Sequence, residues 1–147
     1  MKRALAVVEA SESAKELVRE AGELAAGVGA ELVLLHVTTN EEYEDTRTSL
    51  EGIPNLETSY TAGQALEGAR QFAQDIGREV LDGDVEYEAV GRIGDERDQI
   101  LDAATELDCD HVFLAGRKRS PTGKALFGDR TQSVILDFDG AVTVVTE

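Results

Sequence analysis

The segment HVFLAGRKRSPTGKALFGDRTQSV, residues 111–134, joins a short apolar run to a helix start through a basic, glycine-containing turn. The run 111–115 predicts a buried strand, and residues 130–136 predict a helix. The segment contains five of the chain's 14 basic residues and only one acidic residue, Asp129. The basic residues are Arg117, Lys118, Arg119, Lys124 and Arg130. In a chain of formal charge −16, this contrast indicates a place where an anion can bind.

The same strand-then-helix order recurs along the chain, which is typical of stacked βαβ units. We expect strands at 3–8, 31–37, 85–90, 111–115 and 141–146, and helices at 12–28, 62–81, 96–107 and 130–136. In the first helix, apolar residues from Ala14 to Val28 recur on one face, and the next two helices repeat the pattern. Each helix is therefore expected to cover a sheet.

Strand composition predicts the strand order, because strands buried on both faces are continuously apolar. Residues 4–8, 32–35 and 112–115 fit central strands, whereas 85–90 carries Glu86 and Glu88 on one face and 141–146 is short and final. With right-handed crossovers, the order that leaves these two outside is 3-2-1-4-5; the order 2-1-3-4-5 would bury both glutamates. We predict a single-domain, three-layer α/β fold with an open, parallel, five-stranded, Rossmann-like sheet. A crevice should open beyond the carboxyl ends of the first and fourth strands.

Length and composition limit the classes of function. A chain of 147 residues with 41% hydrophobic content fits one domain over residues 1–147, and the lone Cys109 excludes an internal disulfide and fits a reducing cytoplasm. Thirty acidic against 14 basic residues would repel nucleic acid and anionic membranes, and no stretch is long enough to span a bilayer. We expect a halophilic, salt-rich cytosol, with an ordinary acidic protein as the alternative.

Three segments resemble the universal stress protein family, of the UspA-like type, over nearly the whole chain. They are Val7-Val8-Glu9-Ala10-Ser11, Leu34-Leu35-His36-Val37 and Gly116 to Val134. The resemblance implies an adenine nucleotide alpha-hydrolase-like fold, a regulatory stress-response role and frequent homodimers. The nucleotide-binding members of the family have a motif of Gly, two residues, Gly, nine residues, Gly, then Ser or Thr. The segment that begins at Gly116 resembles this motif, with Gly116 and Gly128 as the outer glycines. Here Arg119 replaces the middle glycine, the second gap is one residue short, and Asp129 replaces the hydroxyl residue.

The resemblance implies where a nucleotide such as ATP, with Mg²⁺, would lie. Glu9 would lie near the base and ribose, Val7 and Val37 would line the base, and glycine N–H groups would approach the phosphates. The candidate nucleotide-binding residues are Val7, Glu9, Val37, Ala115, Gly116, Arg119, Gly128, Asp129, Arg130 and Thr131.

Several of these residues also allow a purely structural interpretation. Asp129, with Gln132 three residues on, predicts an N-cap and capping box, which we favour over a ligand contact. The basic residues could bind phosphate in two-point geometry or form a solvated loop paired with the acidic surface. Arg119 could clamp a phosphate or fill the crevice itself.

Other chemistries fit poorly, and we predict no catalytic residue and no metal site. Gly123-Lys124 is followed by Ala125 rather than a hydroxyl residue, so it is not a P-loop, and no Gly-x-Ser-x-Gly elbow is present. Gly91, Gly94 and Asp95 predict a turn leading to an N-cap. His36 and His111 are interpreted as structural, and any catalysis would be slow ATP hydrolysis.

Two further expectations concern the connection 38–60 and the last strand, 141–146. We interpret the connection as a floppy acidic surface loop, with a lid over the crevice as the alternative. The final strand is apolar for an edge, which predicts a homodimer through this strand. The leading hypothesis is a regulatory protein that binds an adenine nucleotide weakly; the alternative is a member that acts only through unidentified protein partners.

Overall fold

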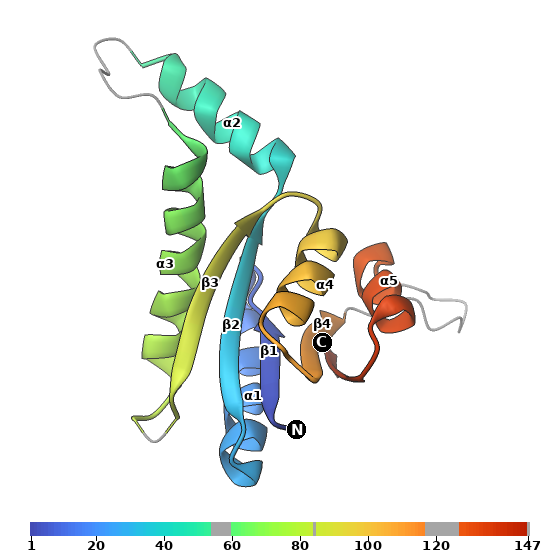
Figure 1. Ribbon diagram of the computed structural model, residues 1–147. Helices are drawn as coiled ribbons and strands as arrows, with labels where there is room; N and C mark the ends of the chain where they lie inside the picture. The colour runs from blue at the N-terminus through green and yellow to red at the C-terminus, as the bar shows by residue number, and fades with distance from the viewer. Residues whose placement is uncertain (54–59, 84, 117–126, 147) are drawn as a thin grey trace.

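The computed structural model describes residues 1–53, 60–83, 85–116 and 127–146 of the chain (Figure 1). The elements, in chain order, are β1 (Arg3–Val7), α1 (Ala14–Val28), β2 (Glu31–Thr38), α2 (Asn40–Glu51), α3 (Ala62–Val80), β3 (Tyr87–Ile93), α4 (Glu96–Glu106), β4 (His111–Gly116), α5 (Asp129–Asp137) and β5 (Ala141–Thr146).

The sheet has the order β3-β2-β1-β4-β5, and each neighbouring pair is parallel. This confirms the predicted order. Leu5 in β1 lies beside Val33 in β2 and Val112 in β4, and all three side chains are fully buried. The strands that are continuously apolar therefore occupy the centre, and the strand that carries Glu88 lies at an edge.

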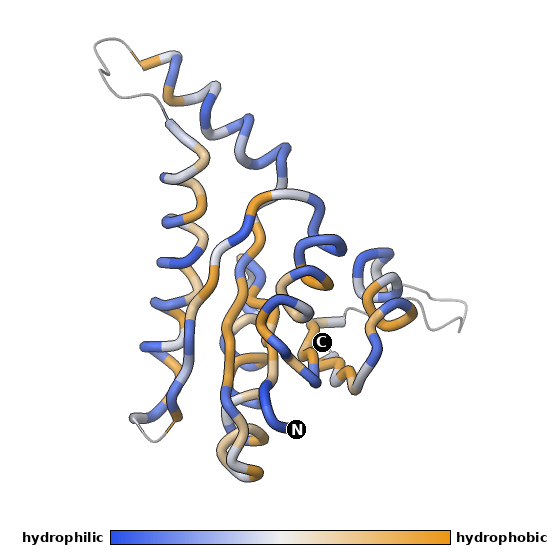
Figure 2. The backbone as a smooth tube through the Cα atoms, in the orientation of Figure 1, coloured by the Kyte–Doolittle hydropathy of each residue, from blue (hydrophilic) through white to orange (hydrophobic). Residues whose placement is uncertain are grey.

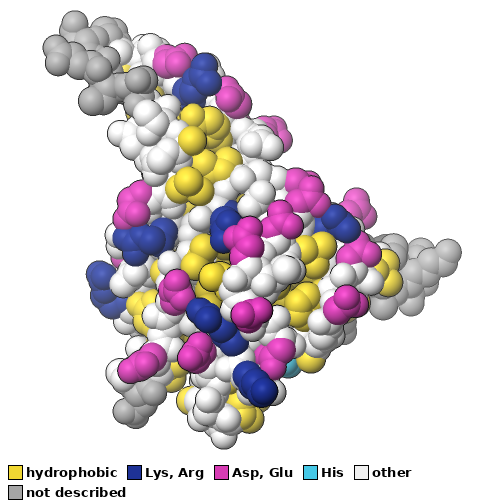
Figure 3. All heavy atoms as spheres, in the orientation of Figure 1, with side chains coloured by type: hydrophobic (Ala, Val, Ile, Leu, Met, Phe, Trp, Pro, Cys, Tyr) yellow, Lys and Arg dark blue, Asp and Glu magenta, His cyan; other side chains and the backbone are white. Residues whose placement is uncertain are grey.

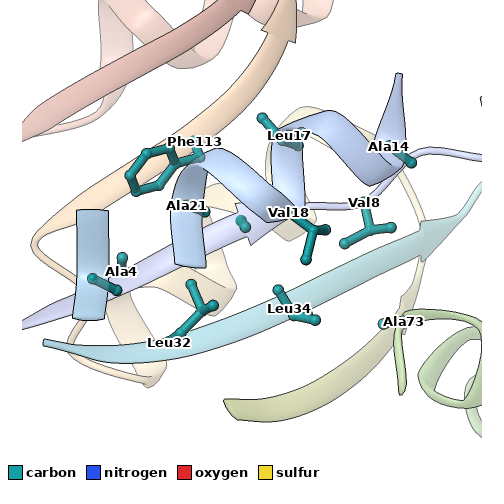
Figure 4. Close-up of a cluster of buried hydrophobic side chains, with 12 residues drawn as sticks. Ala4, Val8, Ala14, Leu17, Val18, Ala21, Leu32, Leu34, Ala73 and Phe113 are labelled. Carbon is teal, nitrogen blue, oxygen red and sulfur yellow. The ribbon is translucent and has the colours of Figure 1, made fainter. Parts of the chain in front are cut away.

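Alternate strand residues supply two separate cores, one on each face of the sheet. On one face, Ala4, Val8 and Leu34 pack with Phe113 and with residues of α1 and α3 (Figure 4). On the other face, residues such as Leu5, Leu35 and Leu114 pack against α4 and α5. Burying one such side chain contributes roughly 1.5–3 kcal/mol to folding stability. The two cores therefore hold the carboxyl ends of the strands in fixed positions.

The interpretation of 38–60 as a loop is wrong for its first part, because α2 covers residues 40–51. Thr39 caps this helix by accepting from the Glu42 N–H, and Glu42 completes a capping box. No side chain of α2 is buried among the described residues, and the helix extends away from the sheet in Figure 1 and is mostly hydrophilic in Figure 2. Because α2 buries none of its side chains, it needs no apolar stripe. Its sequence therefore lacks the hydrophobic periodicity from which a helix is predicted.

Gly91 lies inside β3, so its predicted place in a turn is wrong, whereas Asp95 does cap α4 by accepting from the Asp98 N–H at 3.0 Å. A Cβ on Gly91 would lie 2.3 Å from the Leu66 carbonyl oxygen and 2.5 Å from the Arg70 nitrogen. The glycine therefore permits close approach of β3 and α3.

Within the described ranges, no helix is both long and apolar enough to cross a membrane.

Candidate functional site

A cavity of about 200 Å³ opens at the carboxyl ends of β1 and β2. Its lining comes from both strand ends and from the starts of three helices: Val7, Val8, Glu9, Ala10, His36, Val37, Glu42, Glu96 and Arg130. Three predicted site residues far apart in sequence, Glu9, Val37 and Arg130, thus meet here with Val7. We call this space the β1 cavity.

The floor of the β1 cavity is apolar and fixed by the sheet. Val7 and Val37 are 3% and 5% exposed, so each presents only a small surface to the cavity. His36 donates from Nδ1 to the Val8 carbonyl oxygen at 2.7 Å, and its ring lies 4.4 Å from that of Phe72. These contacts fit the structural role expected for His36 and hold the two strand ends together.

Charged groups close one side of the β1 cavity. The Arg130 guanidinium, on the first turn of α5, forms ion pairs with Glu9, which follows β1, and with Glu96, the first residue of α4. The three side chains are 24%, 28% and 34% exposed, respectively, so water screens the pairs only in part. We call this arrangement the Glu9–Arg130–Glu96 bridge.

Burial shifts the protonation equilibria of the bridge. It raises the pKa of the Glu96 carboxyl above its usual range, and the nearby Glu42 and Asp95 carboxylates raise that pKa further. Burial also lowers the pKa of the Arg130 guanidinium. Desolvation therefore disfavours the charged forms of both groups.

A second cavity, of about 460 Å³, lies on the other side of the bridge; we call it the α4 cavity. The first residues of α2, α4 and α5 line it: Thr39, Asn40, Glu41, Gly94, Asp95, Glu96, Arg97, Asp129, Arg130 and Ser133. Glu96 and Arg130 line both cavities, so the bridge stands between them.

The junction of β4 and α5 holds the remaining predicted site residues that the structure describes. Thr131, 3% exposed, donates from Oγ1 to the Ala115 carbonyl oxygen at 3.1 Å. A Cβ on Gly116 would lie 2.5 Å from Val144 Cγ1, so a side chain there would collide with β5. Gly128 is the N-cap of α5 and supplies no side-chain bond. The junction is thus tightly packed beside the two cavities.

The predicted capping role of Asp129 is wrong. Asp129 is the first residue of α5, and Gln132 donates to the Phe127 carbonyl oxygen at 2.8 Å instead of completing a capping box. The Asp129 carboxylate faces the α4 cavity, where it adds negative charge close to the helix N-terminus.

The other basic residues of the turn, Arg117, Lys118, Arg119 and Lys124, lie outside the described residues. The prediction of a cationic rim is therefore tested at Arg130 alone, and there the charge is paired with two carboxylates. Figure 3 shows acidic side chains distributed over the face it presents, with basic side chains among them.

Cys109 and His111 occupy structural positions away from the two cavities. His111 Nε2 lies 2.7 Å from Thr143 Oγ1 on the neighbouring strand, and Cys109 is 8% exposed. In the part of the chain that the structure describes, no group of three or more His, Cys, Asp or Glu side chains is arranged to hold a metal ion.

Sequence reasoning missed Glu96 and Glu42 as site residues. The T-x-x-E pattern at Thr39–Glu42 could have predicted the start of α2, and with it a carboxylate at this edge of the sheet. The pairing of Glu96 with Arg130, by contrast, joins two helices through tertiary packing and leaves no local signal.

Comparison with protein families matches residues 1–146 to the model described as the universal stress protein family. Comparison with curated proteins gave no significant match.

Solved structures with a similar fold include a universal stress protein from Archaeoglobus fulgidus, with 26% identity, a TM-score of 0.65 and coverage of 98% of this chain and 97% of that one. An Archaeoglobus fulgidus universal stress protein in complex with dAMP has 20% identity, a TM-score of 0.60 and coverage of 98% and 96%. A universal stress protein in complex with cAMP has 17% identity, a TM-score of 0.66 and coverage of 99% and 96%.

Proposed function

We propose, because this chain belongs to the universal stress protein family, that the β1 cavity binds the base and ribose of an adenine nucleotide and that the protein acts as a nucleotide-dependent regulator. The observation that carries the proposal is the meeting of Val7, Val37 and Glu9 in one cavity at the carboxyl edge of a parallel sheet. Two apolar side chains would contact the flat base, and the Glu9 carboxylate would accept from ribose hydroxyls.

The phosphates would extend from the β1 cavity toward α5. Arg130 and Arg97 are the described cations that line the α4 cavity. The N-terminus of α5, with the positive end of its dipole, lies at the same cavity, because Asp129 and Arg130 line it. Ala115, Gly116, Gly128, Asp129 and Thr131 shape this junction, and Arg119 remains a predicted phosphate contact. The proposed ligand is ATP with Mg²⁺; the metal would offset the charge of Asp129 beside the phosphates. Any turnover would be slow.

The two related structures in complex with dAMP and cAMP support the choice of an adenine nucleotide, because their chains share this fold. They are distant in sequence, so the proposal depends on the cavity of this chain and not on residue matches.

Isothermal titration calorimetry with ATP and Mg²⁺ tests the proposal, in molar KCl because the chain carries a formal charge of −16. We expect weak binding that Val37→Met abolishes, since the longer side chain would fill the floor of a cavity of about 200 Å³. Val28→Met, at a position 60% exposed on α1, is the matched control and should leave binding unchanged. Heat that persists in the Val37 variant would place the nucleotide elsewhere.

A second candidate function is favoured by the Glu9–Arg130–Glu96 bridge, in which two carboxylates already pair with Arg130. In this case the protein binds no nucleotide and acts only through protein partners. The absence of both calorimetric heat and a thermal shift at millimolar ATP would favour this function over the first.

We also propose that the protein is a homodimer joined through antiparallel β5 strands. β5 is an edge strand, and its residues 142–145 are half-buried in the single chain, which leaves apolar surface and one row of backbone groups unpaired at the edge. Light scattering at micromolar concentration and high salt should give twice the chain mass, whereas a monomer would refute the dimer.

A further inference from the structure

Arg130 joins three distant parts of the chain at one point. Its Nη2 is directed to Glu9 Oε1 and its Nη1 to Glu96 Oε2, so each terminal nitrogen has a different carboxylate. The two carboxylates come from the end of β1 and the start of α4, and both line the β1 cavity together with Arg130.

The bridge divides the space available to a ligand. The β1 cavity, at about 200 Å³, is smaller than the roughly 300–1,000 Å³ typical of sites for small organic ligands. The α4 cavity, at about 460 Å³, begins on the far side of Glu96 and Arg130. A nucleotide with its base in the β1 cavity would need the second space for its phosphates, and the bridge lies in the way.

We propose that the bridge is a built-in competitor of the nucleotide phosphates and that Glu96 is the residue that holds Arg130 away from them. The inference rests on the proposed function and adds to it a determinant of phosphate selectivity. In the closed bridge, Arg130 binds Glu96; in the open bridge, the same guanidinium binds a phosphate and the two cavities join.

The guanidinium has unused capacity for such an exchange. Arg130 Nε is buried and has no hydrogen-bond partner among the described residues. A buried donor without a partner carries a desolvation cost, which a phosphate oxygen would remove. Arginine presents Nε and Nη in a fork that matches a phosphate in two-point geometry.

Glu96 is the weaker end of the bridge. Its carboxylate faces Glu42 from α2 and its own neighbour Asp95, and both repel it; burial adds to the cost of its charge, consistent with its raised pKa. Exchange of Glu96 for a phosphate would therefore leave Arg130 still paired with Glu9, so that only half of the bridge needs to open.

Calorimetry on Glu96→Gln, with ATP and Mg²⁺, adenosine, and inorganic tripolyphosphate as three probes, tests the inference. Glutamine keeps the size of the side chain and removes the charge that holds Arg130. We expect the affinity for ATP and for tripolyphosphate to rise about tenfold, which corresponds to about 1.4 kcal/mol, and the affinity for adenosine to stay the same.

Glu42→Gln is the matched control for simple loss of negative charge. Glu42 lines the same cavity, has no ion pair with Arg130 among the described contacts, and keeps its capping box as glutamine. Because the Glu42 carboxylate repels Glu96, its loss should also strengthen the pairing of Glu96 with Arg130, so the gain in phosphate affinity should be much smaller than in Glu96→Gln. Adding Arg130→Gln to the Glu96 variant should remove the gain.

The outcomes separate the two proposals. Equal gains in the Glu42 and Glu96 variants, or no gain in either, would overturn the bridge as a competitor. A gain for tripolyphosphate alone, with no binding of adenosine or ATP, would support the bridge and contradict the adenine site. A gain for ATP and tripolyphosphate specific to Glu96 would support both.

Discussion

The buried hydroxyl of Thr131 donates to the carbonyl oxygen of Ala115 at 3.1 Å and so ties the first turn of α5 to the end of β4. The bond therefore fixes the position of Thr131 relative to Ala115. Arg130 precedes Thr131 directly, so the same bond sets the position from which its guanidinium reaches Glu9.

Replacing Thr131 with valine should lower the free energy of unfolding by about 1–3 kcal/mol, because the partly buried carbonyl oxygen of Ala115 loses this donor while the side-chain volume hardly changes. Thr131→Ser keeps the hydroxyl and should recover most of this loss. Urea unfolding followed by circular dichroism measures both variants. An equal loss in the serine variant would show that packing of the methyl group, and not the hydrogen bond, holds the junction.

Gly91→Ala should destabilise the protein by several kcal/mol, since the added Cβ would lie 2.3 Å from the Leu66 carbonyl oxygen and neither backbone can move freely. Gly68→Ala, on the exposed side of α3 with no atom within 4 Å of the new Cβ, should instead stabilise by about 0.5–1 kcal/mol. Thermal unfolding of the two variants compares one substitution in two environments. Similar melting temperatures would contradict the close approach of β3 to α3.

The caps of α2 and α3 should differ in their effect on stability although their chemistry is the same. Thr39 and Thr61 accept from the N–H groups of Glu42 and Gln64 at 3.1 and 3.2 Å, each within a capping box. Thr61→Ala should cost about 1 kcal/mol of global stability, because α3 packs on the sheet. Thr39→Ala should cost little, because no described side chain of α2 is buried.

Hydrogen exchange gives the second measurement for the caps. Amides of α2 should exchange faster than those of α3, and Thr39→Ala should speed exchange in α2 alone. Protection of α2 equal to that of α3 would show that α2 is held by contacts beyond those in the single chain.

The free energy of unfolding should fall above pH 9 because of Cys109. Burial raises the pKa of its thiol from 9.0 to about 11, so the folded state keeps a proton that the unfolded state releases first. The loss should be about 1.4 kcal/mol per pH unit from this thiol between the two values. It is absent below the unfolded pKa and complete above the folded one.

Cys109→Ala should remove that part of the pH dependence, which urea unfolding at pH 8, 9 and 10 would measure. The folded protein should also react slowly with iodoacetamide at pH 8, and unfolding should release the reaction. Fast alkylation of the folded protein would show that the Cys109 thiol is not buried and that its pKa is not raised.

The strand order could be predicted from the sequence because burial on both faces leaves a direct trace, as in the unbroken apolar run from Ala4 to Val8. The predicted crevice beyond β1 and β4 matches the β1 cavity only in part, because this cavity lies at the ends of β1 and β2 and includes Arg130 of α5 but no residue of β4. The helix α2 could not be predicted from periodicity, because its side chains pack against almost nothing.

The details at α5 and the bridge lay beyond sequence reasoning for a different reason. Asp129 suits an N-cap, but the N-cap of α5 is Gly128, one residue earlier, and the Gln132 side chain donates to the Phe127 carbonyl oxygen instead of completing a capping box. The pairing of Arg130 with Glu96 depends on where α4 and α5 meet, which no local spacing encodes.

Nuclear magnetic resonance titration of the ¹⁵N-labelled protein with ATP and Mg²⁺ tests the nucleotide site most directly. We expect saturable chemical-shift changes centred on the amides of Val7 to Ala10, His36, Val37 and Arg130. No change at millimolar nucleotide, or changes confined to residues remote from the β1 and α4 cavities, would contradict it.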